Sequence, residues 1–177
     1  PVWLIVMAVM LTASVMIAAL AINTISAVFV FLGAFFYAVV YTVWLKRRSW
    51  LNIVIGGLAG SFAVLAGAAA VDPELGPLPL LLAAVLFLWT PPHFWSLAIA
   101  NQDEYAAAGI PMLPVVVGAQ RAATIVFWST VALALTAVLP IWFGAGLIYL
   151  LGALVGGVYF VFKAWQLSRN PSRKTAM

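Results

Sequence analysis

Residues 78–105 read LPLLLAAVLFLWTPPHFWSLAIANQDEY, and this stretch shows how the chain is built. Its first part, up to Ala100, is almost entirely apolar and long enough to cross the roughly 30 Å hydrocarbon core of a bilayer, which takes about 20 helical residues. The polar residues 101–104 then follow without a proline or glycine. We therefore predict a transmembrane helix over 78–100 that continues past the membrane surface to near Tyr105.

The composition of the whole chain supports the same conclusion for the other segments. Hydrophobic residues make up 67% and charged residues 7% of the sequence, against about 45–50% and 25% in soluble domains. Only helices and closed barrels satisfy their backbone groups inside a bilayer, and the apolar runs here are continuous rather than alternating, which favours helices. The absence of cysteine excludes disulfides and thiolate metal sites.

The apolar runs predict an all-α, polytopic transmembrane helical bundle that forms one domain over residues 1–177. The third run is rich in glycine and alanine, so it should be buried among its neighbours, because small residues let helix backbones approach closely in lipid. The six predicted spans cover residues 2–20, 25–45, 53–71, 78–100, 122–139 and 147–165.

The charged residues predict the orientation of these spans. With six spans, all eight lysines and arginines fall on one side, whereas Asp72 and Glu74 lie on the other. This asymmetry predicts a multi-pass protein of a bacterial or archaeal cell membrane with its basic loops in the cytoplasm. Asp103 and Glu104 then also lie on the cytoplasmic side. The net charge of +4 reports membrane orientation here and not binding to nucleic acid.

The fourth span contains two features that suggest a pocket. Pro91 and Pro92 remove backbone donors within a helix, which predicts a kink at Pro91, and such a kink often opens a cavity. His93 follows directly, and an ionisable side chain in a span usually faces the bundle interior. His93 and Glu104 lie nearly three helical turns apart, roughly 16 Å, and so share one face if the helix is continuous. A purely structural role remains open for the prolines and the histidine.

The adjacent carboxylates Asp103 and Glu104 suggest a cation site. Mg²⁺ commonly uses one or two carboxylates together with waters and substrate phosphate. The alternative is a solvated acidic pair that partners the basic residues 46–48.

Two ordered stretches resemble the protohaem IX farnesyltransferase (haem O synthase) branch of the intramembrane UbiA prenyltransferases. One joins WTPPHFW at 89–95 to DEY at 103–105 and AGIPMLP at 108–114, and the other joins YTVWLKR at 41–47 to NIVIGGLAG at 52–60. The resemblance implies transfer of a farnesyl group from farnesyl diphosphate to a vinyl group of haem B, giving haem O. Haem B is then a substrate, and Mg²⁺ acts with the diphosphate.

The resemblance also implies roles for individual residues. Asp103 and Glu104 are predicted catalytic metal ligands, and His93 is a predicted catalytic residue that contacts haem or places a water. Whether a haem A synthase docks on the protein stays open. The predicted substrate-binding residues are Lys46, Arg47, Asn52, Trp89, Phe94, Trp95, Tyr105 and Arg121.

The family has about nine helices and a first acidic motif, Asn-x-x-x-Asp-x-x-x-Asp, that this sequence does not contain. We therefore expect a fragment that lacks two helices before it and one after it, and that does not produce haem O by itself. Two alternatives remain: another UbiA prenyltransferase acting on a quinone or chlorophyll precursor, and a transporter or channel fragment, since broken helices also occur in transporters.

Overall fold

The computed structural model describes residues 2–176, and in this range six helices are long and apolar enough to cross a membrane. They confirm the predicted all-α architecture, with ends shifted by a few residues from those expected. The six spans are Val2–Ala21, Thr24–Leu45, Asn52–Val71, Pro77–Ala100, Ala119–Phe143 and Leu147–Arg169.

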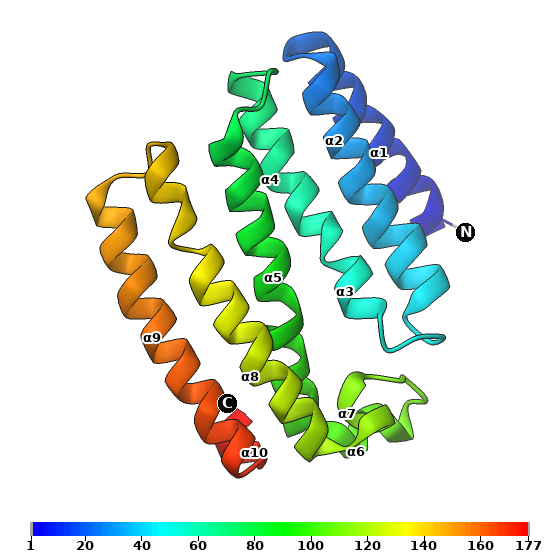
Figure 1. Cartoon of the computed structure of the whole chain (residues 1–177). Helices are drawn as coiled ribbons and strands as arrows, with labels where there is room; N and C mark the ends of the chain where they lie inside the picture. The colour runs from blue at the N-terminus through cyan, green and yellow to red at the C-terminus, as the bar shows by residue number, and fades with distance from the viewer. Residues whose placement is uncertain (1, 177) are drawn as a thin grey trace.

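The spans form a row in chain order (Figure 1). The sequence of contacts runs from α1 (Val2–Ala21) through α2 (Thr24–Phe35), α4 (Leu58–Val71), α5 (Pro77–Ala100) and α8 (Ala119–Thr136) to α9 (Leu147–Arg169). The glycine-rich third span lies between the second and the fourth. It is among the most buried spans, as its small residues predict, whereas α1 and α9 at the two edges of the row are the most exposed.

Two spans change helix type along their length, and a third is interrupted. The second span continues from α2 into a π-helix, η1 (Phe36–Leu45), and the third begins with α3 (Asn52–Gly56) before Gly57 separates it from α4. The fifth ends in a 3₁₀-helix, η2 (Leu139–Phe143). π-Helical turns are rare and are often found at functional sites. Both η1 and the break at Gly57 border an apolar cavity of the site described below.

The fourth span differs from the prediction at its end. Helix α5 stops at Ala100, because Asn101 has φ −122° and ψ 32° and a new helix, α6 (Gln102–Ala107), begins after it. The side-chain amide of Asn101 donates to the Leu97 carbonyl (2.9 Å), a local bond that competes with continued helix. The expected continuous helix to Tyr105 is therefore wrong, and His93 and Glu104 do not share a helix face.

The proline pair, in contrast, does not interrupt the helix. Helix α5 runs unbroken from Pro77 to Ala100 with Pro91 and Pro92 inside it, and both prolines are buried. Next to them the Thr90 hydroxyl donates to the Leu86 carbonyl (2.9 Å). The backbone break of this region thus lies at Asn101 and not at the prolines.

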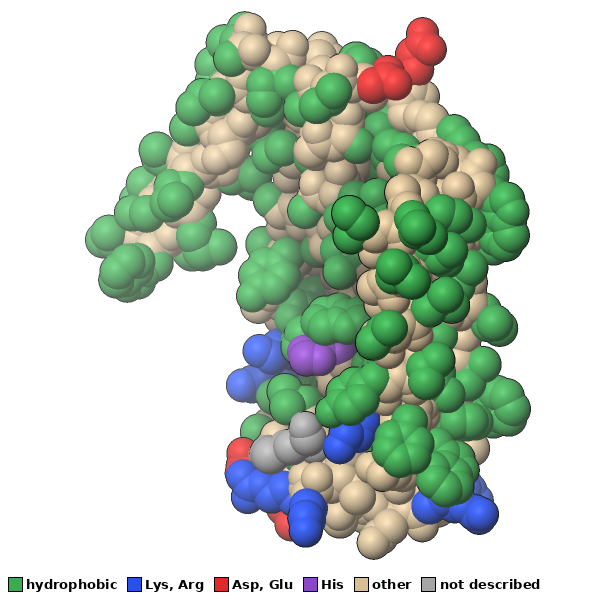
Figure 2. Space-filling model, turned by 90° about the vertical axis from the view of Figure 1, so that its left-hand side faces the viewer, with side chains coloured by type: hydrophobic (Ala, Val, Ile, Leu, Met, Phe, Trp, Pro, Cys, Tyr) green, Lys and Arg blue, Asp and Glu red, His purple; other side chains and the backbone are tan. Residues whose placement is uncertain are grey.

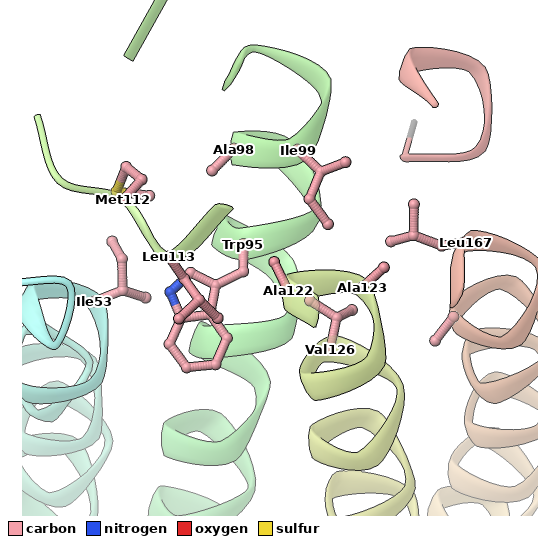
Figure 3. Close-up of a cluster of buried hydrophobic side chains, with 11 residues drawn as sticks. Ile53, Trp95, Ala98, Ile99, Met112, Leu113, Ala122, Ala123, Val126 and Leu167 are labelled. Atoms are coloured by element: carbon pink, nitrogen blue, oxygen red, sulfur yellow. The ribbon is translucent and has the colours of Figure 1, made fainter. Parts of the chain in front are cut away.

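A buried apolar cluster fixes the connection between the fourth and fifth spans (Figure 3). Trp95, Ala98 and Ile99 of α5 pack there against Met112 and Leu113 at the start of α7 (Leu113–Val117). Ile53 closes the cluster from α3, and residues of α8 and α9 complete it. This packing holds α6 and α7 across the end of the bundle at which they connect α5 to α8.

The charges separate along the length of the bundle (Figure 2). Asp72 and Glu74 follow α4 at one end of the bundle, and the lysines and arginines gather at the opposite end of the bundle. The short helices α6, α7 and α10 (Arg173–Ala176) lie at the basic end. The predicted one-sided distribution of cations therefore holds in three dimensions, with Asp103 and Glu104 at the basic end.

Polar bonds between neighbouring helices join the row laterally. The Ser26 hydroxyl of α2 donates to the Ala66 carbonyl of α4 (2.9 Å), and the Ser61 hydroxyl of α4 donates to the Ala83 carbonyl of α5 (2.9 Å). The Asn23 amide donates to the Ala69 carbonyl (2.7 Å). Such bonds in membrane proteins typically stabilise by about 0.6 kcal/mol.

We expect Ser26→Ala to lower the unfolding free energy by about 0.5–1.5 kcal/mol. The substitution removes the hydrogen bond to the Ala66 carbonyl, and alanine offers no donor to replace it. Ser14→Ala is the matched control, since Ser14 is exposed on α1. Reversible unfolding of the detergent-solubilised chain measures both. Equal effects of the two substitutions would show that the Ser26 bond does not hold α2 to α4.

Candidate functional site

An apolar cavity of about 340 Å³, which we call the tyrosine cavity, lies between the second, third and fourth spans. Small residues of the third span form the floor of this cavity. Aromatic residues of η1 and α5 form its walls. This size and lining are typical of a binding site for an apolar small molecule. Its lining residues are Tyr37, Tyr41, Ile53, Gly56, Gly57, Ala59, Gly60, Leu86, Trp89, Thr90 and Phe94.

The glycines of the third span make room for this cavity. A Cβ atom on Gly56 would lie 2.7 Å from a Tyr41 ring carbon, and one on Gly57 would lie 3.1 Å from the Cβ of Thr90. Helices η1 and α5 therefore approach the third span at a distance that a larger residue would not permit. Tyr37 and Tyr41 of η1 stack on each other, with ring centroids 5.9 Å apart, and form the facing wall.

His93 lines a different cavity of about 320 Å³ between α5, α8 and α9, which we call the histidine cavity. It is more polar than the tyrosine cavity, because Ser96, Lys163 and Thr175 reach it together with the imidazole. Figure 2 shows the only histidine on this face of the molecule, nearer to the basic end than to the acidic end. The remaining lining residues are Leu97, Val126, Tyr159, Phe160, Ala164, Leu167 and Ala176.

An aromatic ridge on α5 separates the two cavities. The Trp89 and His93 rings are stacked with centroids 4.2 Å apart, and Phe94 meets His93 edge-on at 5.1 Å. Trp89 lines the tyrosine cavity and also a further hollow beside α8 and α9, which shares Phe160 with the histidine cavity. The cavities are thus neighbours on one face, and the predicted aromatic residues Trp89 and Phe94 stand at their boundary.

Asp103 and Glu104 line a third, polar cavity, which we call the carboxylate cavity. Both are exposed in the first turn of α6, and Arg173 faces the same space. Residues 171–173 border this cavity, whereas Thr175 and Ala176 border the histidine cavity. His93 and the two carboxylates, which would share one helix face if the fourth span were continuous, therefore line separate cavities, with the chain around α10 between them.

Residues 2–176 contain no group of three or more His, Cys, Asp or Glu side chains that could hold a metal. Two carboxylates remain a fitting set for Mg²⁺ when waters and phosphate complete the shell. Asp103 and Glu104 meet this requirement in part, because both reach one polar cavity.

Two predicted substrate-binding residues lie in the interior and reach none of these three cavities. Trp95 is 4% exposed and faces the apolar cluster beside Leu113 (Figure 3). Asn52 is fully buried, and its amide donates to the Lys46 carbonyl (3.2 Å), which holds the loop after η1. The Asn52 Oδ1 and Trp95 Nε1 atoms are buried and have no hydrogen-bond partner among residues 2–176. Neither residue therefore lines one of the cavities described above.

The other predicted substrate-binding residues lie around the basic end. Arg47 and Arg121 are exposed, and Tyr105 packs against the apolar cluster. The ammonium of Lys46 lies 6.0 Å from the centre of the Tyr41 ring, close to the tyrosine cavity. Of this group, only Lys46 is brought next to a cavity by a contact.

Several lining residues were not predicted as functional. Tyr37 and Tyr41 come from the second span, and Lys163 and Tyr159 come from the sixth. Lys163 offered a signal, since it is the one charged residue inside the predicted span 147–165. The glycines of the third span were predicted as packing residues only, although they also form a cavity floor.

We expect Gly56→Ala to destabilise the chain by about 1–3 kcal/mol, because the added methyl group must displace Tyr41 in a packed contact. Gly67→Ala is the matched control: no atom lies within 4 Å of a Cβ there, and alanine should stabilise the helix by about 0.5–1 kcal/mol. Unfolding in detergent compares the two. A neutral Gly56→Ala would show that Tyr41 does not need the close approach.

Comparison with known proteins agrees with this architecture. Residues 2–177 match the UbiA prenyltransferase family. The chain is 56% identical over its whole length to protoheme IX farnesyltransferase 2 of Paramagnetospirillum magneticum, of which it covers 62%. It is 52% identical over 171 residues to protoheme IX farnesyltransferase 1 of the same organism, covering 60%.

A more distant relative is the protoheme IX farnesyltransferase of Roseiflexus sp., 47% identical over 161 residues, or 90% of this chain and 30% of that protein. No solved structure matches the chain. The chain thus spans about three-fifths of the length of the two P. magneticum relatives. With a family match that extends along nearly all of its residues, this integral membrane chain belongs to the UbiA prenyltransferase family.

Proposed function

We propose that this chain forms the substrate cavities of a protohaem IX farnesyltransferase, which transfers a farnesyl group from farnesyl diphosphate to a vinyl group of haem B. The relatives named for that activity support the proposal. The observation that carries it is the aromatic ridge of Trp89 and His93 between an apolar cavity and a more polar one. Two unlike substrates can meet across such a ridge.

The tyrosine cavity suits the farnesyl chain. Its lining is apolar, and the rings of Tyr41, Trp89 and Phe94 border it. Ionisation of farnesyl diphosphate gives an allylic cation, which aromatic faces stabilise and which water would destroy. We assign the farnesyl chain to this cavity and the porphyrin to the histidine cavity and the hollow beside it.

The carboxylate cavity suits the diphosphate. Asp103 and Glu104 would hold Mg²⁺, and the ion would neutralise the charge of the departing diphosphate. Arg173 supplies a positive side chain in the same cavity. These residues bind and orient the leaving group at the basic end, which we place in the cytoplasm on the positive-inside rule.

The reaction breaks the C1–O bond of farnesyl diphosphate, the π bond of the vinyl group and one O–H bond of water, and it forms one C–C and one C–O bond. The bond between C1 of the farnesyl group and the diphosphate oxygen breaks, and the electron pair leaves with diphosphate. The terminal vinyl carbon of haem B forms a bond to C1, a water adds to the other vinyl carbon, and one proton is released. We propose that His93 holds this water. Haem O is the product, and a haem A synthase is the class of partner that would consume it.

The test is a chimera in which residues 1–177 replace the matching segment of the P. magneticum relative at 56% identity. Membranes carrying this chimera should form haem O from haem B and farnesyl diphosphate, but no prenylated product from 4-hydroxybenzoate. The unmodified relative is the control for expression and assay. A chimera that inserts at the relative's level and prenylates only 4-hydroxybenzoate, or neither acceptor, contradicts the proposal.

A further inference from the structure

Lys163 of the sixth span lines the histidine cavity. Neither the family resemblance nor the proposed reaction gives this lysine a role. Lys163 of α9 lines this cavity opposite His93 of α5, with α8 between the two helices. Helix α9 ends at Arg169, so Lys163 lies about 9 Å before that end along the axis. His93 lies about 10 Å before the end of α5. The two residues thus lie at similar distances from the ends of their helices and line the same cavity.

The direction of the Lys163 side chain matters. Lysines near the end of a membrane helix ordinarily extend toward the headgroups to keep the ammonium in water. Here the ammonium lies 5.7 Å from the centre of the Tyr159 ring, one turn deeper in the membrane. The contact with the ring contributes some attraction, but it supplies no acceptor for the three ammonium donors.

The chemistry of the cavity identifies the missing group. None of the described residues that line it is acidic, and a cation at this depth is stabilised by an anion. Lys163 itself is exposed, and the cavity beside it is lined by apolar residues of α8 and α9 such as Val126, Phe160 and Leu167, so the anion should belong to a ligand with a large apolar body. A porphyrin with carboxylate side chains on one edge meets both requirements.

We propose that Lys163 binds a carboxylate of haem B and thereby orients the porphyrin in the histidine cavity. This inference rests on haem B being the acceptor in the proposed function. The carboxylate edge of haem then lies against α9, and the opposite edge, which carries a vinyl group, points across the cavity to the Trp89–His93 ridge on α5. Lys163 is thus a substrate-binding residue that decides which edge of haem faces the farnesyl chain.

The experiment measures haem binding to the 177-residue chain in phosphatidylcholine nanodiscs by absorbance titration. The probes are haem B and its dimethyl ester, which lacks the two carboxylate charges. Lys163→Gln should weaken haem B binding at least about tenfold and leave ester binding unchanged, and Lys163→Arg should restore haem B binding. Lys174→Gln, the same charge change in α10 outside the histidine cavity, should have no effect.

The other outcomes separate the inference from the function beneath it. Equal loss of haem B and ester binding in Lys163→Gln, or loss of neither, overturns the role of Lys163. A weaker affinity for farnesyl diphosphate in place of haem B would reassign Lys163 to the diphosphate and overturns it as well. Absence of saturable haem B binding by the unsubstituted chain overturns the proposed porphyrin site itself.

Discussion

Glu104→Gln in the chimera should lower the rate of haem O formation by at least about 100-fold, the loss typical when one group that stabilises developing charge is removed. Glutamine keeps the size of the side chain but removes the negative charge proposed to hold Mg²⁺ beside the diphosphate. Glu104 is exposed in the first turn of α6, so the substitution should not disturb the fold. The measurement is initial rate against Mg²⁺ concentration, with the half-saturating concentration expected to rise.

Glu74→Gln provides the control, because it makes the same chemical change at the opposite, acidic end of the bundle. It should leave both the rate and the Mg²⁺ dependence unchanged. Asp103→Asn should resemble Glu104→Gln, since Asp103 reaches the same cavity. If Glu104→Gln kept the rate and the Mg²⁺ dependence of the unsubstituted chimera, the carboxylate cavity would not be the metal site.

Trp89→Ala should lower haem O formation in the chimera by about 100-fold and raise the fraction of farnesyl diphosphate that ends as farnesol. The Trp89 ring stands between the tyrosine cavity and the hollow along α8 and α9, and it stacks on His93. Its removal would join these spaces and admit water to the allylic cation. Ionisation has by then broken the bond between C1 and diphosphate, so capture by water forms a C–O bond at C1, releases a proton and gives farnesol.

The ratio of farnesol to haem O is the decisive measurement, because loss of folding would lower both products together. Trp89→Phe should retain most of the barrier and keep farnesol low. Trp128→Ala controls for loss of a large ring, since Trp128 is 62% exposed on the fifth span. A Trp89→Ala chimera that loses haem O without gaining farnesol would show that Trp89 does not exclude water.

Much of the architecture follows from local properties of the chain. Apolar length fixed the six spans to within a few residues, and the distribution of lysine and arginine fixed which ends lie together. The run at 89–95 also marked Trp89, His93 and Phe94, which line neighbouring cavities. These features follow from the composition and order of the residues. A membrane constrains both, because each span must be apolar and must satisfy its own backbone hydrogen bonds.

The end of the fourth span was predicted wrongly for a local reason that the apolar pattern does not contain. The Asn101 side chain bonds to the Leu97 carbonyl, and α6 turns away to join α7. Because of this turn, the relation between His93 and Glu104 could not be obtained from their spacing. The position of Trp95 could not be predicted from its neighbours in the sequence either. Phe94 and Ser96 line cavities, whereas Trp95 between them is buried.

Residue order and composition were enough to predict a six-span helical membrane chain with one basic end and an aromatic, histidine-bearing fourth span. The packing of the helices was needed to show which side of that span each residue faces, that the carboxylates and the imidazole line separate cavities, and that Lys163 of α9 lines the same cavity as His93. The physical reason is that helical spacing relates residues to their own axis alone. Which distant helix covers each face depends on the packing of the whole row.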